Sequence, residues 1–248
     1  MINQENLEIS LIIPIYNEEV LVKDALLECL KLLSEKFYNY EIIIIDDGSR
    51  DKSLQIIEEY FNSNPNIRIE KNHVNLNQGI SVQRGLKMAK FKWVTFNGID
   101  FPLSITELST VLSEAHYNSD IIVFERKKYL GATKWRLLTS NINILLRFIL
   151  FPRLSSGFND MNFTQVYRKE IIDLIMPLAK SPAFTTPEML FRAKLKNLRI
   201  VKVKSKFHER KHGTGSLGKL HDILWTIYDM IRFRYLLWVG IEKHGKTK

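Results

Sequence analysis

Residues 11–49 read LIIPIYNEEVLVKDALLECLKLLSEKFYNYEIIIIDDGS, and this stretch decides the fold. Two short apolar runs rich in isoleucine flank a segment from Val20 to Lys36, whose apolar residues recur at helical spacing. Short β-branched runs of this kind are typical of strands that are buried on both faces of a parallel sheet. The stretch therefore predicts a strand–helix–strand unit, with strands over 8–13 and 41–45.

A polar cluster follows each of the two predicted strands. The first runs from Tyr16 to Glu19, and the second from Asp46 to Ser49. The carboxyl ends of parallel strands are where open α/β sheets bind ligands, and carboxylates there suit ribose hydroxyls, base N–H groups or a phosphate-bound metal. A turn into a helix with Ser49 as N-cap would explain Gly48 and Ser49. It would not explain two adjacent aspartates directly after four isoleucines.

The alternation of strand and helix continues through the first half of the chain. Helical patterns over 52–61, 80–89 and 104–116 alternate with apolar runs over 67–71, 93–96 and 120–124. This rhythm predicts an α/β fold with a doubly wound, mostly parallel sheet flanked by helices.

The second half of the chain has a weaker rhythm. We expect a helix over 135–151 that Pro152 stops, a Ser/Gly loop over 154–159 and a strand over 163–167. A further helix over 185–195 would have Thr185 or Thr186 as its cap and Pro187 in its first turn. A long amphipathic helix over 220–241 ends the pattern, and its aromatic residues either lie on a membrane surface or pack on the domain.

Charge is divided unevenly between the two halves of this 248-residue chain. Residues 1–125 hold 11 basic and 19 acidic residues, whereas residues 126–248 hold 25 basic and 8 acidic ones, a net charge of +17. A basic half predicts a polyanionic partner, such as an anionic membrane or phosphates. Nucleic acid is a poor candidate, because the arginines lie in apolar helices. The single cysteine, Cys29, lies on the apolar side of its helix and is predicted to be buried.

The chain lacks both common glycine-rich phosphate loops, GxxxxGK[ST] and GxGxxG. This absence argues against an NTPase and against a dinucleotide-dependent oxidoreductase. Phosphates would have to be neutralised by a divalent metal on carboxylates or by arginines and lysines.

Three motifs in the first half together resemble the family 2 inverting glycosyltransferases, which have the GT-A fold. They are Pro14-Ile15-Tyr16-Asn17-Glu18, Asp46-Asp47-Gly48-Ser49, and Asn75-Leu76-Asn77-Gln78-Gly79 followed by Arg84-Gly85. Later motifs resemble the dolichol-phosphate mannosyltransferase branch and its bacterial polyprenyl-phosphate relatives: Trp135-Arg136, Asn143 and Arg147 in one helix, then Ser155-Ser156-Gly157-Phe158, then Arg210-Lys211-His212-Gly213. The resemblance covers roughly residues 9–234.

The resemblance implies a role for each matching residue. It implies a single GT-A domain whose residues 1–125 bind the nucleotide sugar, whose residues 126–215 bind the acceptor, and whose residues 216–248 form the amphipathic helix. The implied donor site consists of Pro14, Tyr16, Asn17, Glu18, Asp46, Asp47, Gly79, Arg84 and Arg210. Arg136 and Arg147 match arginines that bind the acceptor phosphate. Asp100 matches the last aspartate of the DxD motif, which holds Mg²⁺ or Mn²⁺, but Gly98 replaces the first.

The function implied is transfer of a hexose from a nucleotide sugar of the GDP-mannose or UDP-glucose type to polyprenyl or dolichyl phosphate. One alternative is transfer to a sugar hydroxyl, which needs a base. Glu188 is the candidate base, although the helix dipole alone would explain a glutamate at a helix start. Another alternative, motivated by Gly98, is a non-catalytic nucleotide-sugar-binding protein. We expect a peripheral protein on the cytoplasmic face of a membrane, because no apolar run reaches the ~20 residues of a membrane span.

Overall fold

Seven strands form one sheet in the part of the chain that the computed structural model describes, which is residues 7–114, 118–126, 134–205 and 220–241. The strand order is β3-β2-β1-β4-β6-β5-β7. The strands are β1 (Glu8–Ile15), β2 (Asn39–Asp46), β3 (Ile67–Lys71), β4 (Trp93–Phe96), β5 (Ile121–Arg126), β6 (Gln165–Arg168) and β7 (Ile200–Ser205). Only β6 runs antiparallel to its neighbours, β4 and β5. The prediction of an α/β fold with a mostly parallel sheet is confirmed.

The predicted strand–helix–strand unit is β1, α1 (Val22–Lys36) and β2. β1 and β2 pair in parallel over their whole length, so that Ile15 lies opposite Asp46. Both strands extend further than predicted, and the second aspartate of the cluster follows directly after the strand. The unit therefore delivers both polar clusters to one edge of the sheet.

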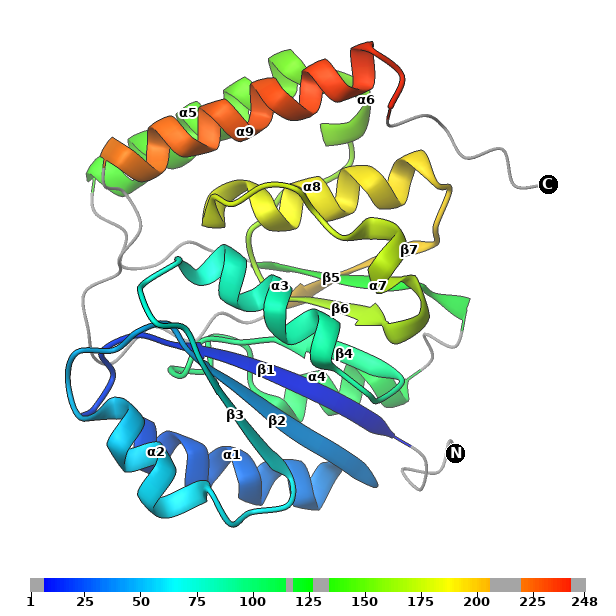
Figure 1. Ribbon diagram of the computed structural model, residues 1–248. Helices are drawn as coiled ribbons and strands as arrows, with labels where there is room; N and C mark the ends of the chain where they lie inside the picture. Colours follow the sequence, from blue (N-terminus) through cyan, green and yellow to red (C-terminus); the bar gives the residue numbers. More distant parts are fainter. Residues whose placement is uncertain (1–6, 115–117, 127–133, 206–219, 242–248) are drawn as a thin grey trace.

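Helices cover both faces of the sheet (Figure 1). α1, α2 (Ser53–Phe61) and α4 (Ile105–Ser113) lie on one face, where Ile42 and Ile44 of β2 point into the core. α3 (Gln78–Met88), α7 (Ile172–Ile175) and α8 (Pro182–Leu195) lie on the other face with Ile43 and Ile45. A short 3₁₀ helix, η3 (Lys169–Ile171), leads into α7. A Cβ at Gly85 would lie 2.4 Å from Ile12 Cγ2, so glycine is what allows α3 to pack closely on β1.

Two further helices form a layer outside α8 (Figure 1). They are α5 (Lys134–Leu150) and α9 (Leu220–Trp238), which contact each other, and the short α6 (Pro152–Ser155) follows α5. Four buried phenylalanines, Phe151, Phe184, Phe191 and Phe233, join this layer to α8, with ring centroids 5.0–6.2 Å apart. Within the described ranges, no helix combines the length and the apolar character that crossing a bilayer requires.

Two predicted helix starts were wrong, those of α8 and α2. α8 begins at Pro182 with Ser181 as its N-cap residue, so Pro187 lies inside the helix. α5 ends at Leu150, just before Pro152 as predicted, and Pro152 then begins the separate helix α6, because proline fits the first turn of a helix. Ser49 is not the N-cap of α2, whose N-cap position is Lys52. The Ser49 hydroxyl instead accepts the backbone N–H of Asn17 at 3.0 Å.

Candidate active site

Asp47 follows β2 and is fixed in place by the structure around it. The residue is 3% exposed, and its backbone N–H donates to the Ile15 carbonyl at 2.8 Å. Its Oδ1 accepts hydrogen bonds from Asn72 Nδ2 at 2.8 Å and from the Leu76 backbone N–H at 2.9 Å. These contacts bind the loop after β3 to the end of β2. We infer that Asp47 shapes the site rather than offering its Oδ1 to a ligand.

Asp46 is buried beside it but is held less completely. Its Oδ2 accepts the Ser49 backbone N–H at 3.2 Å. Its Oδ1 is buried and has no hydrogen-bond partner within the described ranges, although the residue is only 2% exposed. A buried carboxylate oxygen without a donor is costly, by about 1–3 kcal/mol or more, and native structures rarely keep one without a reason. We infer that an N–H or O–H group of a ligand would supply the donor that the Asp46 carboxylate lacks.

The turn after β1 is tied to the turn after β2 by reciprocal hydrogen bonds. The Asn17 side-chain oxygen accepts the Arg50 N–H at 2.8 Å, and Ser53 Oγ accepts the Glu18 N–H at 2.7 Å. Asn17 has a positive φ of 56°, which asparagine tolerates better than most residues. The Asn17 side chain is thus used to hold the two turns together. Tyr16 is 38% exposed, so its ring can stack on a ligand at this edge.

Arg84 acts on the site through another residue. Its Nη1 donates to Asn72 Oδ1 and to the Lys71 carbonyl, each at 2.8 Å, and its Nη2 pairs with Glu70. Asn72 in turn donates to Asp47. Arg84 therefore positions the Asp47 carboxylate. The direct contact of Arg84 with the nucleotide sugar, which the sequence predicts, stays a prediction.

Gly79 is a packing position in this structure. A Cβ there would lie 2.6 Å from Thr185 Oγ1 and 3.0 Å from the Lys180 carbonyl oxygen. The start of α3 therefore lies directly against the start of α8. Glycine permits this close approach, through which α3, in the first half of the chain, packs against α8, in the second half.

Asp100 lies in a tight turn after β4, where the sequence predicts a metal site. The Phe101 N–H donates to the Gly98 carbonyl at 3.0 Å, and Asn97 Nδ2 donates to the Leu103 carbonyl at 2.7 Å. Asp100 Oδ1 lies only 2.5 Å from the position that a Cβ of residue 98 would take. The Asp100 carboxylate thus occupies the space that an aspartate side chain at position 98 would need.

The described part of the chain contains no group of three or more His, Cys, Asp and Glu residues arranged to hold a metal ion. Mg²⁺ is commonly held by one or two carboxylates together with phosphate oxygens of the substrate. The single carboxylate of Asp100 therefore fits a metal that arrives with a diphosphate, and it fits a free metal ion poorly.

Restoring the missing carboxylate tests this interpretation. We expect Gly98→Asp to tighten Mn²⁺ binding in the absence of nucleotide by about tenfold or more, because it adds a second charged ligand. Only the flexible end of Asp100 must turn aside to admit it. Titration calorimetry with MnCl₂ measures the effect, and Gly98→Ala is the matched control that adds a Cβ without charge. Equal Mn²⁺ affinities for the two variants would contradict the assignment of Asp100 as the metal carboxylate.

Glu188, the candidate base, is the seventh residue of α8, so its predicted place at a helix start was wrong. It is 1% exposed. Its two carboxylate oxygens accept the N–H groups of Leu178 at 2.9 Å and Ala179 at 2.7 Å, and Oε1 also pairs with Arg192 at 2.8 Å. Burial raises the pKa of Glu188, while Arg192 and the two N–H groups act in the opposite direction. A raised pKa suits a base, but both oxygens already hold the 177–181 segment in place.

The two arginines predicted to bind the acceptor phosphate lie in α5. They are 11 positions apart, which corresponds to about 16 Å along a helix. Arg147 is only 6% exposed, so it offers little surface to a ligand in this structure. The role predicted for Arg147 stays a prediction. The side chain of Arg136 and the whole of Arg210 lie outside the described residues, and their roles stay predictions.

The Ser/Gly loop predicted over 154–159 is held in place by side-chain contacts that the sequence did not predict. It covers residues 156–160, between α6 and β6. Arg126 at the end of β5 makes a two-point contact with Asp160, at 2.5 and 3.0 Å, and Glu125 accepts both the backbone N–H and the side chain of Asn159. Lys194 donates to the Ser156 carbonyl at 2.6 Å. The adjacent charged residues Glu125 and Arg126 at a strand end were a local signal for these contacts.

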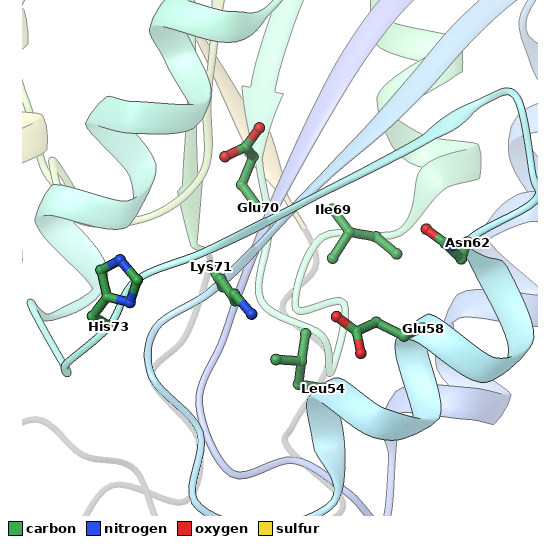
Figure 2. Close-up of a pocket in the computed structure, with 7 residues that line it drawn as sticks. All are labelled: Leu54, Glu58, Asn62, Ile69, Glu70, Lys71 and His73. Atoms are coloured by element: carbon green, nitrogen blue, oxygen red, sulfur yellow. The ribbon is translucent and has the colours of Figure 1, made fainter.

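A pocket of about 310 Å³ lies between α2 and the edge strand β3 (Figure 2). Leu54 and Glu58 line it from α2, Asn62 from the C-cap of α2, and Ile69 and Lys71 from β3. Lys71 is the register partner of Asp46 on the neighbouring strand. The pocket therefore begins one strand outward from the Asp46 carboxylate, on the same edge of the sheet.

The family model of glycosyl transferase family 2 matches residues 10–175, which is more than half of the chain and contains the Asp46, Asp47 and Asp100 positions. The chain belongs to glycosyltransferase family 2. The family predicted from the motifs of the sequence is thereby confirmed.

Curated relatives of this family 2 glycosyltransferase include polyprenyl-phosphate transferases, as the later motifs predicted. A dolichyl-phosphate beta-glucosyltransferase of Dictyostelium discoideum is 36% identical over 96 residues, 36% of this chain and 29% of that protein. An undecaprenyl-phosphate 4-deoxy-4-formamido-L-arabinose transferase of Proteus mirabilis is 23% identical over 231 residues, 90% of this chain and 67% of that protein. The first of these matches thus spans less than a third of the relative's length.

A solved structure supports the fold of this glycosyltransferase. Glucosyl-3-phosphoglycerate synthase from Mycobacterium tuberculosis, solved with Mn²⁺, UDP and glucosyl-3-phosphoglycerate, superposes with a TM-score of 0.65. The match covers 92% of this chain and 80% of the synthase, at 17% sequence identity. At that identity the likeness establishes the GT-A architecture of the chain.

Proposed function

We propose that this glycosyltransferase moves a hexose from a nucleoside diphosphate sugar to a polyprenyl phosphate, with inversion at the anomeric carbon. The observation that carries the proposal is the buried Asp46 carboxylate, whose Oδ1 has no donor within the described ranges. It stands at the strand edge where the nucleoside of such a donor is expected, beside the exposed ring of Tyr16. The names of the Dictyostelium and Proteus relatives support a lipid-phosphate acceptor.

The reaction is a single displacement. An oxygen of the acceptor phosphate attacks the anomeric carbon from the side opposite to the leaving diphosphate. The new carbon–oxygen bond forms as the bond to the diphosphate breaks, and the electron pair departs with the nucleoside diphosphate. A phosphate acceptor is already anionic at neutral pH, so no proton must be removed. The protein needs only to align the reactants and to stabilise charge on the leaving group.

This chemistry agrees with the contacts of Glu188. Transfer to a hydroxyl needs a general base within reach of the acceptor, and Glu188 was the candidate. Both of its oxygens accept backbone N–H groups, and it pairs with Arg192. A phosphate acceptor removes the need for this base. We therefore assign Glu188 a structural role and favour the phosphate acceptor over the hydroxyl.

A divalent metal fits the proposal in one position. Asp100 would hold it together with oxygens of the donor diphosphate, which supply the ligands that the chain lacks at Gly98. When bound, such a metal neutralises charge on the leaving diphosphate. The Mn²⁺ and UDP in the structure of the mycobacterial synthase are consistent with this assignment.

Transfer assays test the proposed function. We expect labelled hexose to pass from one of GDP-mannose, UDP-glucose or UDP-N-acetylglucosamine to polyprenyl phosphate, in a reaction that Mn²⁺ or Mg²⁺ stimulates. Arg136→Ala should lower turnover about 100-fold while leaving donor affinity unchanged, because one stabilising charge at the acceptor is lost.

Arg153→Ala is the matched control, since Arg153 is an exposed arginine in the same basic half of the chain. Wild-type turnover in Arg136→Ala would refute its assignment to the acceptor. Donor binding without transfer to any acceptor would instead support the non-catalytic alternative.

A further inference from the structure

One face of α5 is apolar and points to solvent. Leu138, Ile142, Leu145 and Ile149 are between 43% and 65% exposed. They are spaced by four, three and four residues, so they form a stripe along one side of the helix. Such a stripe normally faces the core of a soluble protein. Here the core side of α5 is taken by other residues, including the buried Arg147.

A second stripe runs along α9. Leu224, Tyr228, Ile231, Tyr235 and Trp238 are between 56% and 79% exposed, and they are spaced by four, three, four and three residues. α5 and α9 contact each other and lie side by side in the outermost layer of the molecule (Figure 1). We call the two stripes together the α5–α9 face. An apolar surface of this extent marks an interaction site in a soluble domain.

The core does not need this face. The opposite side of α9 carries Met230 and Phe233, which are fully buried, and Phe233 packs on the aromatic cluster of α8. Asp229 on that side accepts the N–H groups of Lys180 and Ser181 at 2.9 and 2.8 Å. α9 is therefore fixed to the domain by its inner side alone. Packing on the domain, the alternative considered from the sequence, does not account for the outer stripe.

We propose that the α5–α9 face docks on the surface of an anionic lipid bilayer. Tyrosine and tryptophan combine an apolar ring with a polar group, which suits them to the boundary between lipid and water. Arg234 is exposed three residues after Ile231 and four before Trp238, so a cation stands within the stripe. Basic residues beside an apolar helical face are characteristic of helices that lie in a membrane interface.

Acidic residues are absent from the α5–α9 face in the described ranges. α5 contains no aspartate or glutamate, and on α9 Asp222 is half-buried and Asp229 is buried. This charge pattern complements anionic headgroups better than a second copy of the same basic surface. The inference extends the proposed function, because a polyprenyl phosphate acceptor is itself embedded in a bilayer. Here two helices, not only the C-terminal one, would meet the lipid.

Vesicle flotation tests the proposal in the absence of donor and acceptor. We expect the wild-type protein to float with vesicles of phosphatidylcholine and phosphatidylglycerol, and to bind pure phosphatidylcholine less. Leu145→Gln/Ile149→Gln on α5 and Ile231→Gln/Trp238→Gln on α9 should each weaken partitioning by about tenfold or more. Arg234→Gln should weaken binding to the anionic vesicles by about fivefold. All five positions are exposed, so the variants should fold.

The matched controls are Leu27→Gln/Tyr38→Gln, which removes exposed apolar side chains on the α1 side of the sheet, and Lys31→Gln on α1. Transfer to a short-chain acceptor in detergent is measured in parallel, so that a failed transferase and a failed membrane dock are distinguished. No flotation of the wild type, or equal losses in stripe and control variants, would overturn the proposal. A loss of flotation confined to the α9 variants would overturn the proposal that both helices contact the membrane. If the wild type does not float but forms a dimer that the stripe variants dissociate, the α5–α9 face is instead a contact between copies of the chain.

Discussion

Glu188→Ala is expected to lower the free energy of unfolding by about 3–5 kcal/mol, because it removes one partner of a buried ion pair and leaves the other charged. Arg192 is only 7% exposed, and the Leu178 and Ala179 N–H groups would also lose their acceptors. For a chain of this size the loss corresponds to a fall in melting temperature of roughly 10 °C. Thermal and urea denaturation measure it.

Glu188→Gln separates structure from catalysis. It keeps one oxygen that can accept a backbone N–H, so its loss of stability should be smaller than that of Glu188→Ala. If Glu188 were a catalytic base, Glu188→Gln would instead lose turnover while its stability stayed near that of the wild type. Glu58→Ala, an exposed glutamate of α2, is the control and should change stability by less than about 0.5 kcal/mol.

The pH dependence of stability follows from the same residue. Burial raises the pKa of Glu188, so folding favours its protonated form. The contribution of this group to stability is complete below the ordinary glutamate range, and it diminishes as the pH rises through the raised value. The glutamine variant lacks this titration. Denaturation at several pH values should therefore show the difference between wild type and Glu188→Gln moving in favour of the variant as the pH rises.

Asp46→Asn should have its largest effect on the donor. We expect the affinity for the nucleoside diphosphate to fall by about 10- to 100-fold, the size of one lost hydrogen bond to a charged group. Stability should stay the same or rise, because the variant removes a buried carboxylate whose Oδ1 has no donor in the described part of the chain. Calorimetric titration with GDP and UDP gives the affinity, and thermal denaturation gives the stability.

Asp47→Asn provides the comparison. Its Oδ1 accepts two hydrogen bonds within the protein, so this variant should lose stability as well as affinity. The two variants are thus expected to differ in stability, because Asp47 accepts two hydrogen bonds on Oδ1 whereas Asp46 accepts none there within the described residues. Unchanged nucleotide affinity in Asp46→Asn would show that Asp46 does not bind the nucleotide, and the proposed function would lose its main support.

Local sequence was sufficient for the first half of the fold. The isoleucine runs and the helical spacing between them predicted β1, α1 and β2, and Asp46 and Asp47 lie at the sheet edge as expected. Ser104 was predicted near the start of a helix and is the N-cap of α4. These features depend on neighbours in the sequence, so they are visible without a structure.

Other features depend on residues far away in the chain. α8 starts before the predicted threonines, and Asp229, 48 positions from Ser181, holds its first residues. Arg84 reaches Asp47 only through Asn72, a chain of contacts that no local pattern reveals. The exposure of the α5 stripe was equally hidden, because helical spacing shows that a face is apolar and not what covers it. These features were not predicted because they depend on residues far away in the sequence, and not because local helix or strand propensities are weak.

The antiparallel strand β6 has a consequence for how the chain folds. The pairings of β2 with β1 and with β3 join strands that are close in sequence, whereas β6 lies between β4 and β5 and its pairing with β4 joins residues as far apart as Trp93 and Arg168, 75 positions away. Contacts of such high sequence separation form slowly, because a long loop must close first. During synthesis the edge of β4 therefore stays open until about two thirds of the chain has emerged. An open strand edge is a template for misassembly, so the second half of the chain also protects the first half from misassembly during folding.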